Sequence, residues 1–110
     1  MTCMTYQKKL RMFSEVAGTL APNVYHYHRR QKDFPCIVWQ EDGGSAFHAD
    51  DARKEIAPTG TLDYFTREEF DPRVDEIEAV FHSLNVSFAL NSVQYEEDTG
   101  LIHYEWVWEW

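Results

Sequence analysis

The last ten residues, LIHYEWVWEW, constrain the fold more than any other part of the chain. Successive side chains of a β-strand point to opposite faces, so one face of this segment is almost entirely aromatic. That face carries Ile102, Tyr104, Trp106, Trp108 and Trp110. Burial of one tryptophan removes about 150–250 Å² from water, which is worth roughly 4–6 kcal/mol before opposing terms. We therefore expect a strand whose aromatic face is covered by other elements.

The length and composition are those of one compact domain over residues 1–110. With 110 residues, of which 44% are hydrophobic and 15% aromatic, the chain has enough apolar surface for a packed core. No segment approaches the roughly 20 apolar residues of a membrane-spanning helix, and residues 1–12 lack the apolar run of a signal peptide. We therefore expect no membrane association and a location in the cytoplasm before any assembly.

Hydrophobic periodicity predicts two amphipathic helices. The first begins near Thr5 and ends between Gly18 and Pro22. The second follows Asp71, which is a favourable N-cap residue, and ends before Asn85. Their apolar faces are Tyr6, Leu10, Phe13, Ala17 and Leu20 in the first helix and Val74, Ile77, Val80, Phe81 and Leu84 in the second.

Alternating and β-prone segments predict the strands, and polar segments predict the turns between them. The expected strands are 23–29, 34–40, 59–66, 86–97 and 101–110, with a further short strand at 46–49. Residues 29–33 would close a hairpin between the first two strands. Asp42-Gly43-Gly44 predicts a tight turn because both glycines accept positive φ, and Gly100 suits the left-handed position of the last hairpin.

The order of these elements, α-β-β-(β)-β-α-β-β, predicts the fold class. Strands that follow one another through short turns pair as antiparallel neighbours, and two helices are enough to cover one side of such a sheet. We therefore expect an α+β domain with a mostly antiparallel sheet and both helices on one face.

The formal net charge of −9 is concentrated in the second part of the chain. Residues 1–67 contain nine Lys/Arg and eight Asp/Glu, whereas residues 68–110 contain one Arg and eleven Asp/Glu. Phosphate binding needs clustered Lys/Arg, so this distribution argues against nucleic-acid binding by a basic face. Two small basic clusters, Lys8-Lys9-Arg11 and Arg29-Arg30-Lys32, would complement an acidic surface such as that of another copy of the chain.

His26 and His28 form the clearest metal-ligand pattern. A His-x-His pair on a strand projects both imidazoles to one face, where they can chelate one metal ion. Other ligand types for zinc or manganese are His48, Asp50, Asp51 and His103. The sequence does not place a third ligand beside the pair, and the pattern also fits a polar strand face. We expect no metal site.

Catalytic motifs are absent from the sequence. It contains no Gly-x-Ser-x-Gly, no Walker loop, no Cys-x-x-Cys and no Gly-x-Gly-x-x-Gly. Cys36 stands among apolar residues, which predicts a buried thiol, and we expect no disulfide between Cys3 and Cys36. We therefore expect a protein that is not an enzyme and has no cofactor.

Three segments carry a resemblance to a known family. They are PNVYHYHRRQKDFPCIVWQED, TGTLDYFTREEFDPRVDEIEAVF and SVQYEEDTGLIHYEWVWEW. With the first helix they form an ordered pattern over most of the chain, and this pattern resembles the small tail terminator (tail completion) proteins of long-tailed bacteriophages and prophages.

The resemblance implies a structural role in virion assembly. Such proteins form a ring, commonly a hexamer, on the end of the tail tube, where they stop its polymerisation and provide the surface to which the filled head attaches. The implied partners are the tail tube protein and the head-tail connector, and the implied location is the tail-neck region of the virion. DNA passes through the central channel without specific binding.

Two groups of residues are the predicted sites of such a ring. The expected subunit interface is Arg29, Arg30, Lys32, Trp108 and Trp110. The expected channel lining or acidic surface is Glu96, Glu97, Asp98, Glu105 and Glu109. Carboxylates in a channel repel phosphate, so DNA does not adhere to the wall.

Three other functions fit parts of the sequence. A head-tail connector or another neck protein has a similar size. A small acidic inhibitor that mimics DNA fits the length and the charge, and it would be a monomer or a dimer. A metal-dependent hydrolase would use His26, His28 and an acidic partner.

Overall fold

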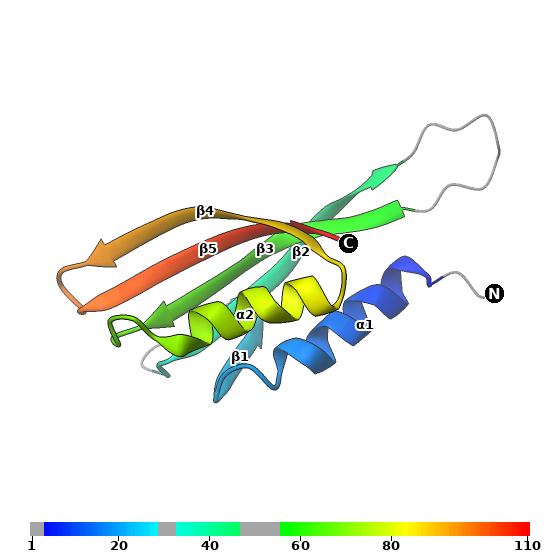
Figure 1. Cartoon of the computed structure of the whole chain (residues 1–110). Helices are drawn as coiled ribbons and strands as arrows, with labels where there is room; N and C mark the ends of the chain where they lie inside the picture. The colour runs from blue at the N-terminus through cyan, green and yellow to red at the C-terminus, as the bar shows by residue number, and fades with distance from the viewer. Residues whose placement is uncertain (1–3, 29–32, 47–55) are drawn as a thin grey trace.

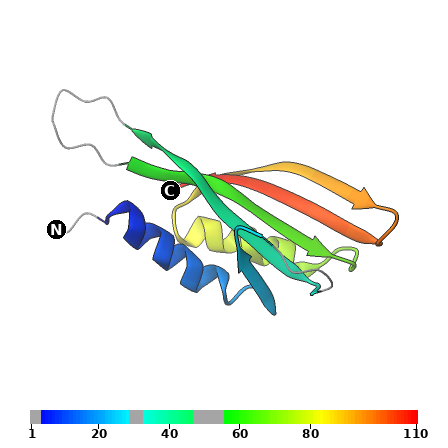
Figure 2. The same ribbon diagram turned by 180° about the vertical axis from the view of Figure 1, so that it is seen from behind.

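The computed structural model describes residues 4–28, 33–46 and 56–110 (Figure 1). The elements are α1 (Tyr6–Ala17), β1 (Asn23–His26), β2 (Cys36–Ala46), β3 (Ile56–Thr66), α2 (Pro72–Ser83), β4 (Ser87–Glu96) and β5 (Leu101–Glu109). The strands form one sheet in the order β1-β2-β3-β5-β4. Figures 1 and 2 show both helices on the same side of this sheet. The expected α+β class, with a mostly antiparallel sheet, is confirmed.

The predicted hairpin between the first two strands is wrong, because β1 pairs with β2 in parallel. Asn23 lies beside Cys36 and His26 lies beside Trp39. The Asn23 side-chain amide donates to the Pro35 main-chain oxygen at 3.1 Å, which holds the starts of both strands together. Alternation identifies a strand but not its direction, and the few residues between these strands favoured an antiparallel pair. Part of the predicted turn, residues 29–32, lies outside the described residues.

The predicted turn at Asp42-Gly43-Gly44 is also wrong, since β2 continues through it. The register with β3 shifts between Glu41 and Gly43, so the glycines accommodate a β-bulge instead of a turn. β3 begins earlier than predicted, at Ile56, and pairs with β2 as far as Ala46. This longer partner keeps the glycine segment in the sheet. Of the predicted short strand at 46–49, residue 46 ends β2 and residues 47–49 lie outside the described residues.

The main core lies between the sheet and the helices. It contains the buried residues Leu10, Phe13, Ala17, Ile37, Trp39, Leu62, Tyr64, Ile77, Phe81, Val86, Trp106 and Trp108. The Phe13 ring stands at its centre, 4.9 Å from the Trp39 ring and 4.5 Å from a ring of Trp108. Aromatic contacts of this geometry add about 0.5–1.5 kcal/mol to the effect of area burial. The predicted apolar faces of both helices therefore face the sheet.

Asp71 caps α2 as predicted and also fixes the helix to the sheet. Its carboxylate accepts hydrogen bonds from the Arg73 N–H at 2.9 Å, the Tyr64 hydroxyl at 2.6 Å and the Thr66 hydroxyl at 2.8 Å. Burial alone would raise the pKa of Asp71, but these donors lower it below its usual value. Burial and the neighbouring carboxylate raise the pKa of Tyr64. The predicted stop at Asn85 is confirmed by its left-handed φ of 61°.

The aromatic face of β5 is covered by the chain itself. Trp106 and Trp108 are 0% and 3% exposed, so the prediction of Trp108 as a subunit-interface residue is wrong. The indole of Trp108 lies over Gly60, where an added Cβ would come within 2.5 Å of it. Trp110 is partly buried, its N–H donates to the Pro58 oxygen at 2.9 Å, and Lys9 donates to its main-chain oxygen at 3.1 Å. The interface role of Trp110 stays a prediction.

Replacement of Trp108 by alanine is expected to destabilise the folded subunit. Loss of a buried indole costs about 3–5 kcal/mol in the free energy of unfolding, because a cavity remains under α1. Urea denaturation followed by circular dichroism measures this value. Val107→Ala is the control, since Val107 lies on the opposite face and is 40% exposed, and it is expected to change the free energy by under about 1 kcal/mol. Unchanged stability of Trp108→Ala with a loss of self-association would contradict the assignment to the core.

Candidate functional site

The structure separates the histidines that the sequence offers as metal ligands. β1 ends at His26, and Tyr27 has a left-handed φ of 80°, so His28 does not continue the strand and the His-x-His strand pair does not form. His26 lies on the helix side of the sheet beside Trp39, whereas His103 lies on the other side against Phe65. His48, Asp50 and Asp51 are outside the described residues. Within the described ranges no group of three or more His, Cys, Asp or Glu is arranged to hold a metal ion.

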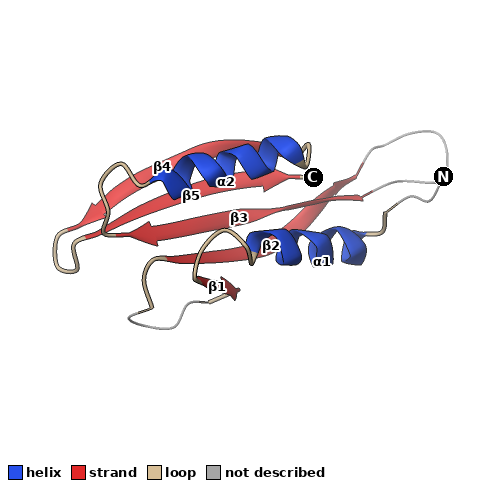
Figure 3. Cartoon of the chain, turned by 60° about the horizontal axis from the view of Figure 1, so that its bottom comes forward, coloured by secondary structure: helices blue, strands red, loops and turns tan. Residues whose placement is uncertain are grey.

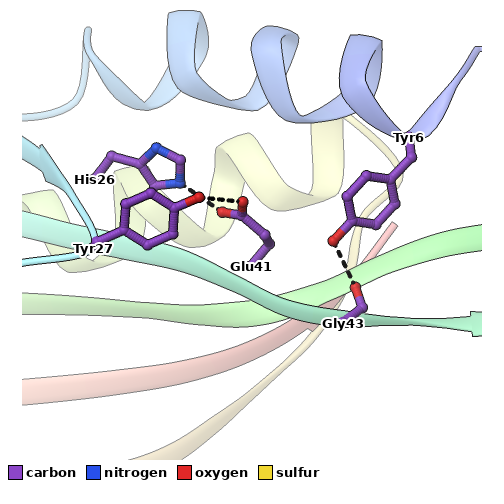
Figure 4. Close-up of polar contacts among 5 residues, drawn as sticks. All are labelled: Tyr6, His26, Tyr27, Glu41 and Gly43. Carbon is purple, nitrogen blue, oxygen red and sulfur yellow. Dashed lines mark hydrogen bonds and ion pairs between the residues drawn. The ribbon is translucent and has the colours of Figure 1, made fainter.

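A polar cluster joins α1, β1 and β2, and we call it the Glu41 cluster (Figure 4). It consists of Tyr6, His26, Tyr27, Glu41 and the main chain of Gly43. The Glu41 carboxylate lies 2.6 Å from His26 Nε2 and accepts a hydrogen bond from the Tyr27 hydroxyl at 2.5 Å. The Tyr6 hydroxyl donates to the Gly43 oxygen at 3.0 Å. The His26 ring stacks between Tyr27 and Trp39, with centroid distances of 3.7 and 3.9 Å.

The electrostatics of the Glu41 cluster favour an ionised carboxylate. Burial alone would raise the pKa of Glu41, but the hydrogen bonds from Tyr27 and His26 lower it below its ordinary value of 4.5. The same hydrogen bond raises the pKa of Tyr27. Burial raises the pKa of Tyr6, with Glu41 and Asp42 adding to the effect. A carboxylate that already has these donors is suited to holding the end of β1 beside β2. Helix α1 is held to β2 separately, by the hydrogen bond from Tyr6 to the Gly43 oxygen.

The helix-free face of the sheet carries a second, smaller apolar cluster. It contains Cys36, Val38 and Phe65, with Tyr25 and Phe34 packed against it, so the buried position predicted for Cys36 is confirmed. The His103 ring stacks on Phe65 at 4.2 Å, and its Nε2 lies 2.9 Å from an Asp63 oxygen. Cys3 is outside the described residues.

The structure places the predicted channel carboxylates in two separate groups. Glu105 and Glu109 lie on the helix-free face of β5, by their alternation with the buried Trp106 and Trp108. The Glu105 carboxylate accepts a hydrogen bond from Asn91 at 2.6 Å. Glu96, Glu97 and Asp98 instead lie at the turn of the β4–β5 hairpin, at the opposite end from Glu109. The hairpin turn includes Gly100 with a φ of 71°, as predicted.

Only part of the predicted basic surface can be located. Arg29, Arg30 and Lys32 lie outside the described residues. Lys8 and Arg11 are exposed on α1, whereas Lys9 is engaged with the main-chain oxygen of Trp110.

The exposed apolar stripe on β4 was not predicted from the sequence. It consists of Leu90, Val93 and Tyr95, which are 46%, 51% and 65% exposed, and we call it the β4 stripe. Its residues pair with Trp106, Tyr104 and Ile102, so they lie on the helix side of the sheet. Alternation in segment 86–97 shows the apolar positions. It does not show that β4 is an edge strand, nor that the helices leave its middle uncovered.

α2 covers only one end of β4. Phe88 packs under the C-terminal part of α2, where its ring lies 4.9 Å from Phe81 and 5.0 Å from His82. Farther along, α2 reaches β5 instead, because Glu78 accepts a hydrogen bond from the Trp106 indole at 2.8 Å. Figure 3 shows β4 at the edge of the sheet. The β4 stripe therefore lies beyond the cover that α2 provides.

Searches for related proteins add no family assignment. No protein-family model matches the chain, and no curated protein matches it. In the described part of the chain, no helix is long and apolar enough to cross a membrane. The resemblance to tail terminator proteins therefore rests on the sequence pattern.

Glu41→Gln is expected to lower stability in a pH-dependent manner. Because the pKa of Glu41 is lower in the folded than in the unfolded protein, its contribution is fully present above 4.5 and is lost as the pH falls through the folded value. At pH 7 the loss is expected to be about 1 kcal/mol or less, since the pair is partly exposed. Thermal unfolding at pH 7 and pH 3 measures the difference.

Glu15→Gln is the matched control for this prediction, because Glu15 is exposed on α1. The Glu15→Gln variant is expected to leave the midpoint temperature of thermal unfolding unchanged at pH 7 and at pH 3. An equal loss of stability for Glu41→Gln at pH 7 and pH 3 would show that the carboxylate charge is not the cause.

Proposed function

We propose that this chain is a non-catalytic structural protein of virion assembly that acts as a phage tail terminator does. In this role it forms a ring, with six copies as the expected number, on the end of the tail tube. The ring stops polymerisation of the tube and provides the surface for head attachment. The observation that supports self-association best is the β4 stripe on the open edge of the sheet.

The β4 edge is well suited to association. Three large apolar side chains gather on one strand that has a neighbour on one side only. From Ser87 to Tyr95 the strand has no charged residue and no proline, which are common means by which natural sheets protect an edge from association. An apolar surface of this kind is stabilised when a partner removes it from water. This is the surface that a self-assembling subunit needs.

The charge distribution fits a channel that admits DNA without binding it. In the proposed ring the helix-free face of the sheet lines the channel, and Glu105 and Glu109 lie on that face. Residues 68–110 contribute eleven Asp/Glu and one Arg to the subunit. Repulsion of phosphate groups by such a wall keeps passing DNA from adhering.

The proposed function predicts self-association that depends on the β4 stripe. Multi-angle light scattering of the purified protein is expected to give the mass of a closed oligomer. Val93→Asp is expected to weaken association by roughly tenfold or more, because it places an unpaired carboxylate in an apolar contact. Gln94→Asp is the control, since Gln94 is exposed on the opposite face of the same strand and its variant is expected to assemble normally. Circular dichroism verifies that both variants fold.

Purified tail tubes distinguish this function from the alternatives. Electron microscopy is expected to show the protein at the tube end, and its addition is expected to stop tube elongation. A protein that remains a monomer at high concentration and has no affinity for tail tubes would contradict the proposal. Binding to the head side alone, without an effect on elongation, would identify a neck protein instead.

A further inference from the structure

We propose that the β4 stripe of one copy docks on the solvent face of α1 of a second copy. This inference rests on the proposed function, because it names the two surfaces through which the copies would meet. It is supported by the exposed apolar side chains of β4 and by the opposite charges of the residues beside them and of the cations on α1.

The β4 stripe has an acidic border. Glu78 lies beside it, since it accepts the hydrogen bond from Trp106, whose strand partner is Leu90. Asp75 is exposed one turn earlier on the same side of α2. Glu97 and Asp98 are exposed in the hairpin turn that follows the stripe. The stripe is thus an apolar strip with carboxylates along one side and at one end.

The solvent face of α1 has the complementary character. Positions 8, 11 and 12 lie opposite the buried positions 10, 13 and 17 on a helix of 3.6 residues per turn. There Lys8 and Arg11 are exposed and Met12 is 37% exposed, and Glu15 is the exposed carboxylate on the same face of α1. Among the described residues no carboxylate forms an ion pair with Lys8 or Arg11. Two cations beside a methionine, which adapts its shape to apolar partners, match an apolar strip with an acidic border.

The main-chain geometry of β4 also bears on the kind of contact that its edge can make. The bulge between Leu90 and Ser92 interrupts the regular main-chain edge of β4. This interruption favours a contact through side chains over a continuous sheet between two copies. The two surfaces differ, so the contact is between unlike patches, as a ring requires.

Disulfide cross-linking tests the contact directly. Met12→Cys and Val93→Cys are made separately in a Cys3→Ser background, which leaves the buried Cys36 in place. When the two variants are mixed and mildly oxidised, the mixed disulfide is expected to exceed both like pairs by roughly tenfold, because only the unlike pair would be in contact. Gln94→Cys, on the opposite face of β4, is the control and is expected to cross-link to Met12→Cys only at background level. A predominant disulfide between two copies of the Val93→Cys variant would overturn the proposal in favour of pairing between two β4 strands.

Charge reversal tests the electrostatic part. Lys8→Glu/Arg11→Glu and Asp75→Lys/Glu97→Lys are each expected to lose self-association, and their mixture is expected to recover it, because each α1 then meets a border of opposite charge. Gln94→Lys/Glu109→Lys, which adds positive charge on the helix-free face, is the control and is expected to assemble. Failure of the mixture to recover association would overturn the proposal.

The mass of the unchanged protein separates this inference from the proposed function. If the unchanged protein forms a ring and binds tail tubes but the cross-link and the charge recovery both fail, the docking surfaces are wrong and the function stands. If the unlike cross-link forms but the assembly has only two copies and ignores tail tubes, the docking surfaces stand and the function is wrong.

Discussion

The packing of the β5 aromatic row beneath the two helices is the interaction on which the rest of the structure depends. Trp106 and Trp108 alternate on one face of β5 and are almost completely buried. Trp108 lies flat over Gly60, and Phe13 of α1 stacks on it from the other side. Because Gly60 has no side chain, the indole can approach the sheet and still leave room for α1. The Trp108 indole thus fills the space between α1 and β3.

Two ionised carboxylates join neighbouring elements around this core. Asp71 joins the start of α2 to Tyr64 and Thr66 on β3, and Glu41 joins β2 to the end of β1. In both cases the donors lower the pKa of the acid more than burial raises it, so the acid remains charged. Asp71 thereby fixes the start of α2 on β3, and Glu41 fixes the end of β1 beside β2.

The placement of the helices also explains why part of the helix side of the sheet remains exposed on β4. α1 and α2 cover β2, β3 and β5, and α2 packs on β4 at Phe88. Leu90, Val93 and Tyr95 therefore remain exposed although they lie on the helix side of the sheet. Carboxylates of residues 68–110 lie along one side and at one end of this surface, and Glu105 and Glu109 lie on the helix-free face.

Local patterns in the sequence determined much of the fold. The spacing of apolar residues placed both helices, Asp71 and Asn85 marked the ends of α2, and the alternation of LIHYEWVWEW identified the face of β5 that is buried. These predictions hold because they depend on the chain within a few residues, where periodicity and capping act. The burial of Cys36 among apolar neighbours was predictable for the same reason.

Only the tertiary structure decided which strands meet and which surfaces remain open. The parallel pairing of β1 with β2, the bulge at Gly43 and the cover over Trp108 all depend on partners distant in the sequence. The exposure of the β4 stripe depends on the same kind of information, since an apolar residue is buried or exposed according to what packs on it. Alternation along a strand gives its two faces, but the element that covers each face is set by the whole chain, because burial is a property of the assembled layers.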